Sequence, residues 1–323
     1  MKKNFQAYSM LEASFIIIIA TILFVGVYEG FNIYRETMIS RSQSLTQGSI
    51  IYRIPSLLTW FESSMPNSFN NKEREEDKTV TLWFDKSSNK IQKFDAYGAQ
   101  NSVNTKFNYE ANAQLNTSGP KFVEDGLNNL PSLKFSNSST KSQFLVIDPS
   151  LQITSNNFSI FIVVNFKKTN SEAIIIDRVC IKNNMEITNQ ENDAIEGCKS
   201  KISLKINNLN KLEFAITNSL NQTVELISQD SIDKKTGHLI ALERNYNNSL
   251  NLYIDGKLSQ TLSENLGNLY PFPIKIGRHA SIENLDYQFE LSELIILEDI
   301  LNQKSRQELE NYFAKKYAIN MNR

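Results

Sequence analysis

An apolar run near the amino terminus constrains this chain more than any other feature. Ala13 to Tyr28 carries no charge, and Lys2 and Lys3 precede the run. Counted from Tyr8, the segment has about 20 residues, the length that a helix needs to cross the hydrocarbon core of a bilayer. The lysines favour a cytoplasmic amino terminus, so the rest of the chain is expected outside the cytoplasm.

Different export signals share such a run. A cleaved signal peptide needs a small residue two positions before the cut, and Phe24-Val25-Gly26 lacks one. A plain signal anchor fits the length but leaves Glu12 unexplained, because an acid within a membrane segment is costly and suggests a function.

Residues Lys3 to Glu12, KNFQAYSMLE, resemble the processing site of type IV prepilins and pseudopilins. In that family a short basic leader ends in a small residue, the mature chain begins with an aromatic residue, and its fifth residue is glutamate. Ala7, Tyr8 and Glu12 match these positions, with Ala7 and Tyr8 in place of the commoner glycine and phenylalanine. The resemblance implies cleavage after Ala7 by a prepilin peptidase, N-methylation of Tyr8, and pairing of Glu12 with a positive amino terminus in a fibre.

The organisation expected after the leader (residues 1–7) has three parts. Residues 8–61 show apolar residues at helical spacing, although Pro55 would bend or end a helix. A helix to about Trp60 would be roughly 80 Å long and would resemble the first helix of pilins, which packs its second half on a globular head. A shorter anchor followed by a stalk is the alternative. Residues 62–78 are polar and charge-dense and predict a linker.

Residues 79–323 are expected to form the head. Its pattern of short apolar segments and turn signals, with Asp255-Gly256 as a tight hairpin, predicts an antiparallel jelly-roll β-sandwich. A closing helix capped at Asn302 or Ser305 should pack on the sandwich. The predicted strands are Thr79–Asp85, Phe144–Ile147, Phe158–Phe166, Ala173–Val179, Lys201–Ile206, Lys211–Thr217, Thr223–Ser228, His238–Arg244, Leu250–Ile254, Lys257–Leu262, Ile274–Gly277 and Tyr287–Leu297.

A second resemblance covers most of the head. Leu82 to Ser87, LWFDKS, resembles the W-x-D-x-S motif of bacterial laminin-G-like, concanavalin-A-like domains, and Gly119 to Phe135 and Leu252 to Gly256 are similar to later motifs of that family. The resemblance implies a jelly roll that commonly binds glycans or proteins, often with calcium. No ligand residue can be carried over, because these motifs look structural.

The residues indicate no catalytic site. His238 and His279 are far apart, and no nucleophile elbow, P-loop or zinc spacing occurs. Glycoside hydrolases on such folds place carboxylates together on one strand, whereas the spacing of Glu290 and Glu293 predicts opposite faces. Several aromatic residues could stack on sugars, although aromatic residues of a sandwich more often lie in its core or at its rim. These candidates are Trp83, Tyr246, Tyr253, Tyr270 and Tyr287.

Cys180 and Cys198 are the two cysteines. In an exported protein a lone pair predicts a disulfide, which would stabilise the fold by about 3 kcal/mol in the chain-entropy model. Two free cysteines are the alternative.

The leading hypothesis is a minor pilin or pseudopilin that displays a non-catalytic, lectin-like head on a type IV pilus or a type II secretion-like fibre. Its expected partners are other pilin subunits, the prepilin peptidase, the membrane, and a glycan or cell-surface protein. Its expected location is the inner membrane with the head outside the cytoplasm. A formal net charge of −1 argues against nucleic acid. The alternatives are a membrane-anchored glycan- or protein-binding protein outside any fibre, and a carbohydrate-active enzyme.

Overall fold

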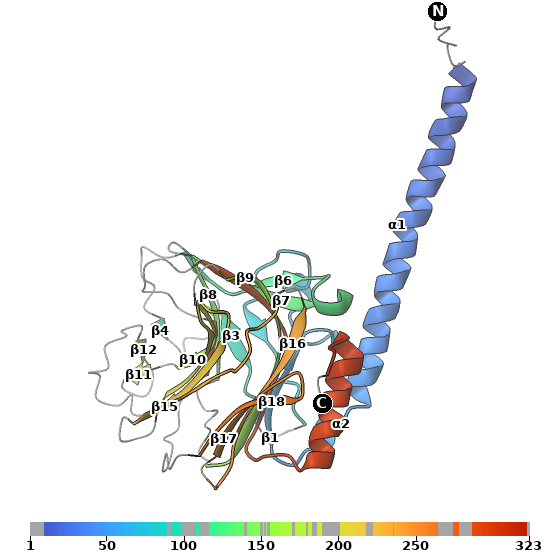
Figure 1. The fold of residues 1–323 in the computed structure, drawn as a ribbon. Coiled ribbons are helices and arrows are strands. Elements are labelled where there is room, and N and C mark those ends of the chain that lie inside the picture. Colours follow the sequence, from blue (N-terminus) through green and yellow to red (C-terminus); the bar gives the residue numbers. More distant parts are fainter. Residues whose placement is uncertain are drawn as a thin grey trace, which may run out of the picture.

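A computed structural model shows a two-sheet β-sandwich from which one long helix projects (Figure 1). It describes residues 10–321 apart from 89–91, 99–107, 110–115, 139–140, 149–150, 152, 154–155, 170–171, 179, 183–185, 189–200, 218–221, 235, 248, 264–273 and 278–285. The predicted fold class, a mainly β protein with a long first helix and a short last helix, is confirmed.

The elements follow in this order. The helices are α1 (Met10–Gln47), the short η1 (Ile50–Arg53), η2 (Asn71–Glu73) and η3 (Leu127–Asn129), and α2 (Gln303–Tyr317). The strands are β1 (Leu57–Glu62), β2 (Leu82–Trp83), β3 (Ala96–Gly98), β4 (Asn108–Tyr109), β5 (Asn116–Ser118), β6 (Lys121–Val123), β7 (Ser132–Asn137), β8 (Lys141–Ile147), β9 (Phe158–Thr169), β10 (Ala173–Arg178), β11 (Cys180–Lys182), β12 (Glu186–Thr188), β13 (Lys201–Ile206), β14 (Leu212–Thr217), β15 (Thr223–Ile227), β16 (Gly237–Arg244), β17 (Ser249–Ile254), β18 (Lys257–Ser263), β19 (Ile274–Gly277) and β20 (Tyr287–Leu297).

The two large sheets enclose the main core. The first has the order β18-β17-β16-β9-β20-β7-β6, with β1 also paired to β20, and the second has the order β15-β14-β13-β10-β19-β8-β3-β2, with β5 beside β8. Apolar side chains that alternate along the strands fill the space between the sheets, and Trp83, Phe135, Phe158 and Phe214 are among the largest. Asp255 and Gly256 both have positive φ, 51° and 79°, so the predicted tight hairpin between β17 and β18 is confirmed.

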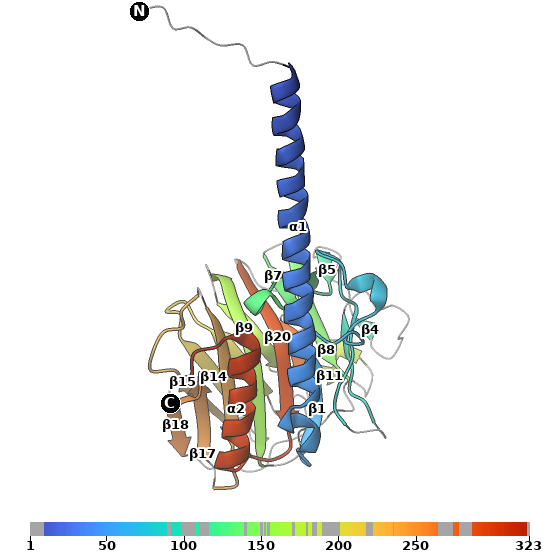
Figure 2. The same cartoon turned by 90° about the vertical axis from the view of Figure 1, so that its right-hand side faces the viewer.

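A second, smaller core lies on the outer face of the first sheet. The helix α2 and the carboxyl-terminal part of α1 run side by side over this face (Figure 2). Leu309 and Phe313 of α2 pack there with Phe161, Ile295 and neighbouring residues. The Asn302 side chain caps α2 by accepting a hydrogen bond from Ser305 N at 2.9 Å. The expectation that the last helix packs on the sandwich is confirmed.

The first helix is shorter than the sequence predicts. It ends at Gln47, and the chain then forms η1 and the strand β1 instead of continuing as helix to about Trp60. Pro55 marks the change, since it removes a backbone donor and disfavours a helix at the residue before it. Beyond it, β1 pairs antiparallel with β20 from Leu57 opposite Leu297 to Glu62 opposite Glu293.

The segment 62–78, predicted as a linker, packs on the head at its amino-terminal end. Ser64, Ser68 and Phe69 are buried, and the Phe69 ring stacks on Trp83 at 5.8 Å between centroids. Its charged part, from Glu75 to Lys78, is exposed. The segment that follows α1 and β1 is therefore packed on the head and is not a free linker.

Candidate functional site

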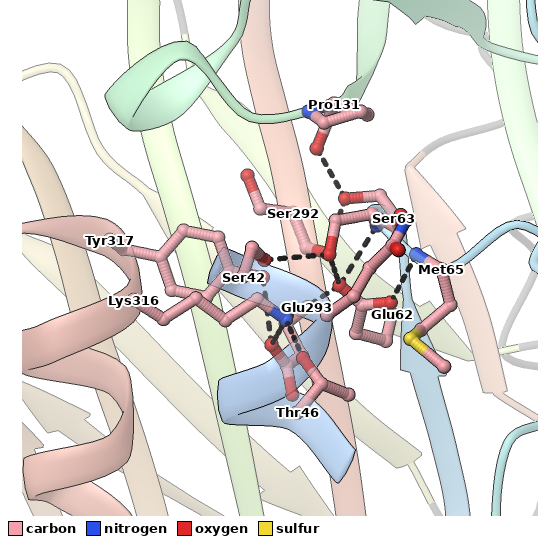
Figure 3. A network of polar contacts seen from close by, with 12 residues as sticks. Ser42, Thr46, Glu62, Ser63, Met65, Pro131, Ser292, Glu293, Lys316 and Tyr317 are labelled. Carbon is pink, nitrogen blue, oxygen red and sulfur yellow. Dashed lines mark hydrogen bonds and ion pairs between the residues drawn. The ribbon is translucent and has the colours of Figure 1, made fainter. Parts of the chain in front are cut away.

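A buried polar cluster joins the carboxyl-terminal part of α1 to the head (Figure 3). Its centre is Lys316 of α2, which is fully buried and forms salt bridges with Glu62 of β1 and with Glu293 of β20, the latter at 3.0 Å. The Lys316 ammonium also donates to Thr46 Oγ1 of α1 at 2.9 Å. Two elements from the first part of the chain, α1 and β1, thus meet two from its last part, β20 and α2, at one ammonium group.

The strand register explains why a cation is needed there. Glu62 and Glu293 lie directly opposite each other on β1 and β20, and like charges in such a cross-strand pair repel. The Lys316 ammonium forms an ion pair with each carboxylate and so compensates this repulsion. Without it, both carboxylates would be buried without a compensating charge, which is strongly destabilising.

Hydrogen-bond donors surround both carboxylates. Glu293 accepts from Trp60 Nε1 at 2.7 Å, from Tyr317 at 2.7 Å and from Tyr312 at 3.0 Å. Burial raises the pKa of the Glu293 carboxyl; Lys316 opposes this shift and Glu62 adds to it. Burial and the nearby Glu293 raise the pKa of both tyrosines well above the usual value, so these hydroxyls remain donors.

Further hydrogen bonds extend the cluster to α1. Ser42 and Ser64 share a hydrogen bond of 2.8 Å between hydroxyls, and Gln43 Nε2 donates to the Ser64 carbonyl at 3.0 Å. Glu62 in turn accepts from the backbone N–H groups of Ser64 and Met65. The cluster has no solvent-exposed carboxylate, so its arrangement fixes the direction of α1 relative to the head and offers no place for a substrate.

One cavity of the head lies at the start of β16. It has a volume of about 530 Å³, and its wall includes Asn128, Asp233, Thr236, His238 and the chain after α2. A second cavity of about 350 Å³ shares Asp233, His238 and Asp255 with it. These volumes lie near the range of small-molecule sites.

His238 holds the wall between the two cavities. Its Nδ1 lies 2.8 Å from Asp255 Oδ2, and its Nε2 lies 2.6 Å from the Asp233 carbonyl oxygen. Burial lowers the pKa of His238, but the hydrogen bond and the charge of Asp255 outweigh this, so that its pKa is raised overall. The protonated ring can donate to both acceptors. His238 is therefore a buried structural residue.

The close approach of a neighbouring loop shapes the same wall. A Cβ atom added at Gly237 would lie 2.3 Å from Leu127 Cδ2, so a larger residue would force the Leu127 side chain of η3 to move. The Asn128 side chain donates to the carbonyl oxygen of Lys316 at 2.8 Å. The cavity therefore lies next to the polar cluster around Lys316, where α1 joins the head.

The W-x-D-x-S motif has a structural role. Trp83 is fully buried and donates from Nε1 to the Glu62 carbonyl at 3.2 Å. Asp85 is 5% exposed and accepts hydrogen bonds from Trp60 N, Ser87 N, Ser87 Oγ and Phe94 N. The motif thus fastens β1 to the second sheet.

The expectation that Glu290 and Glu293 face opposite sides of the sheet is wrong. A register shift between Leu291 and Glu293 changes the alternation of β20. Phe289, Leu291 and Leu294 all point into the sandwich core, so both acids lie on the outer face. Glu290 pairs with Lys167 at 3.2 Å, and Glu293 is fully buried. Glu290 and Glu293 thus each form an ion pair with a different lysine, Lys167 and Lys316, and do not act as the paired acids of a glycoside hydrolase.

Several predicted site residues remain untested. Glu12 is exposed on α1, whereas Ala7 and Tyr8 lie outside the described residues, as do His279 and Tyr270. Cys180 begins β11 and Cys198 lies outside the described residues, so their disulfide stays a prediction. Within the described part of the chain, no group of three or more acidic, histidine or cysteine side chains could hold a metal ion.

The comparisons with known proteins show the fold alone. No protein-family model and no curated protein sequence matches the chain. The botulinum neurotoxin serotype D binding domain, solved alone and with N-acetylneuraminic acid, is 14% identical with a TM-score of 0.52 over 81% of this chain and 52% of its own. The binding domain of botulinum neurotoxin DC in complex with SialylT is 15% identical with a TM-score of 0.50, over 79% of this chain and 51% of its own. The chain therefore spans about half the length of these neighbours, which are described as binding domains.

Proposed function

We propose that this chain is a pilin-type subunit, a minor pilin or pseudopilin, that displays a non-catalytic glycan-binding head. The division of α1 carries the proposal. The large apolar side chains from Phe15 to Tyr34 are each at least 53% exposed, whereas Ser42 and Thr46 are buried against the head. The helix is thus a projecting apolar rod with a fixed base (Figure 1).

The exposed half of α1 has the properties of a membrane segment. It lies within the candidate membrane span of the described residues, Glu12–Arg53, which contains an 18-residue window with a mean hydropathy of 2.1. Hydroxyls within it bond to the carbonyl four residues earlier, as Ser14 does to Met10 and Thr21 to Ile17, which reduces their polarity. In the proposed life cycle this half first crosses the inner membrane, with the head outside the cytoplasm. It then packs among other pilin subunits after the prepilin peptidase has removed the leader.

Glu12 provides the test of this proposal. An uncompensated carboxylate costs several kcal/mol in apolar surroundings, and we infer that the amino group of Tyr8 in a fibre compensates it. Glu12→Ala should leave membrane insertion intact and reduce incorporation into sheared fibres at least about tenfold, the equivalent of 1.4 kcal/mol. Quantitative immunoblots of membrane and fibre fractions measure both.

Glu36→Ala is the matched control, because Glu36 is an exposed acid of the same helix beyond the apolar run. This variant should enter fibres like the wild type. Equal incorporation of Glu12→Ala, or the absence of the wild type from fibres, would favour the alternative of a membrane-anchored binding protein outside any fibre.

We place glycan binding at the cavities beside His238. Support comes from their size, from the polar groups of Asp233 and Thr236, and from neighbours of this fold that were solved in complex with N-acetylneuraminic acid and with SialylT. Asp233→Ala should weaken binding to a glycan identified from a panel about tenfold, since a lost hydrogen bond to a charged group costs about 1.5 kcal/mol or more. Isothermal titration of the full chain measures the affinity.

Glu225→Ala, an exposed acid on β15, is the control and should bind as the wild type does. Binding that Asp233→Ala leaves unchanged would contradict this site. The absence of binding across the panel would contradict the glycan-binding head.

A further inference from the structure

The point where α1 leaves the head has a small cavity with an unusual set of side chains. The cavity has a volume of about 240 Å³ and is lined by Phe31, Asn32, Tyr34, Arg35, Asp125 and Asn129. It combines one guanidinium, one carboxylate and two aromatic rings. Phe31 is 70% exposed and Tyr34 is 53% exposed.

The helix places this cavity at a defined height. The uncharged run ends at Tyr28, and α1 continues beyond it without interruption. At 1.5 Å per residue, Phe31 lies roughly 4.5 Å beyond Tyr28 and Arg35 roughly 10 Å beyond it. The headgroup layer of a bilayer is roughly 5–8 Å thick on each side. When the run occupies the hydrocarbon core, the cavity therefore lies at or just beyond headgroup level. Aromatic residues are enriched at this level of membrane proteins.

The charges of the cavity match a zwitterion. Arg35 forms a salt bridge with Glu124, and its Nε lies 3.9 Å from Asp125 Oδ1. The Asp125 side chain is 61% exposed. A guanidinium binds phosphate oxygens through paired N–H groups. A carboxylate and aromatic ring faces attract an ammonium group. Two acids beside one arginine disfavour a headgroup that carries only negative charge.

We propose that this cavity binds the headgroup of a zwitterionic phospholipid, at the outer surface of the membrane that α1 crosses. The phosphate lies against Arg35, and the ammonium group lies against Asp125 and the ring of Tyr34. This inference rests on the membrane-anchor part of the proposed function. Its consequence is that the lipid holds the head at a fixed depth and rotation on the membrane.

The test uses the full chain in nanodiscs that contain equal parts of phosphatidylethanolamine, phosphatidylcholine and phosphatidylglycerol. Native mass spectrometry after release from the disc counts the lipids that remain bound. The wild type should retain phosphatidylethanolamine over phosphatidylglycerol about two- to fivefold, the range expected for a partly exposed ion pair.

Two variants separate the contributions of the charges. Asp125→Asn should remove the preference for phosphatidylethanolamine, because the ammonium loses its partner, while phospholipid retention persists. Arg35→Gln should lower the retention of all three lipids, because each has a phosphate. Arg41→Gln is the control, since Arg41 is an exposed arginine of the same helix away from the cavity.

Equal retention of the three lipids by the wild type would overturn the inference, as would an unchanged preference in Asp125→Asn. Both results would leave the membrane anchor intact. Failure of the full chain to insert into the nanodisc would instead contradict the anchor of the proposed function.

Discussion

Lys316→Met should destabilise the protein by about 3–5 kcal/mol, the cost of removing one partner from a buried ion pair. The substitution leaves Glu62 and Glu293 opposite each other, fully buried and without the ammonium that compensates them. Chemical denaturation of the full chain, followed by tryptophan fluorescence, measures the loss, because Trp60 donates to Glu293 within the same cluster.

Lys315→Met is the matched control for this experiment. Lys315 is the exposed neighbour of Lys316 on the same helix, and its substitution should change the unfolding free energy by less than about 0.5 kcal/mol. Equal unfolding free energies for Lys316→Met and Lys315→Met would contradict the compensating role of Lys316. The junction would then depend on apolar packing alone.

Asp85→Ala should have an effect of similar size. The buried backbone N–H groups of Trp60, Ser87 and Phe94 would lose their acceptor, and each unsatisfied buried donor costs about 1–3 kcal/mol. We expect a total loss of at least about 3 kcal/mol, measured by the same denaturation. Asp230→Ala is the control, because that side chain is 80% exposed. A loss of less than about 1 kcal/mol for Asp85→Ala would show that the motif is not structural.

The sequence was sufficient for most of the sandwich. The ranges Lys201–Ile206, Ile274–Gly277 and Tyr287–Leu297 match β13, β19 and β20 residue for residue. Strands of this kind alternate apolar and polar residues or are apolar throughout, and turn residues bound them, so local pattern and tertiary structure agree. The last helix was equally predictable, because its cap and its apolar face lie within one short segment.

The strand β1 was missed for a physical reason. Leu57, Leu58 and Trp60 continue the apolar pattern of the preceding helix, and their pairing with β20 depends on residues more than 200 positions away. Pro55 was the available signal for a break. The prediction of opposite faces for Glu290 and Glu293 was also wrong, because the bulge in β20 that changes the alternation has no distinct signature in its sequence.

The polar cluster could not be predicted from the sequence, because it too depends on contacts between distant parts of the chain. The helical spacing of Leu309, Phe313 and Lys316 puts this lysine on the apolar face of the last helix, but its partners come from β1 and β20. A lysine on an otherwise apolar face is the signal that could have indicated buried acids, because lysine is seldom fully buried without a partner. The cavities beside His238 likewise form between segments that are distant in sequence.

The mature amino terminus tests the pilin-type proposal most directly. Mass spectrometry of the amino-terminal peptide should be done on protein from the membrane fraction of cells with and without the prepilin peptidase. We expect the mature chain to begin at N-methylated Tyr8 when the peptidase is present and to retain Met1 to Ala7 when it is absent. A chain that keeps its leader in the presence of the peptidase, or one that is cut after Tyr28, would contradict the account.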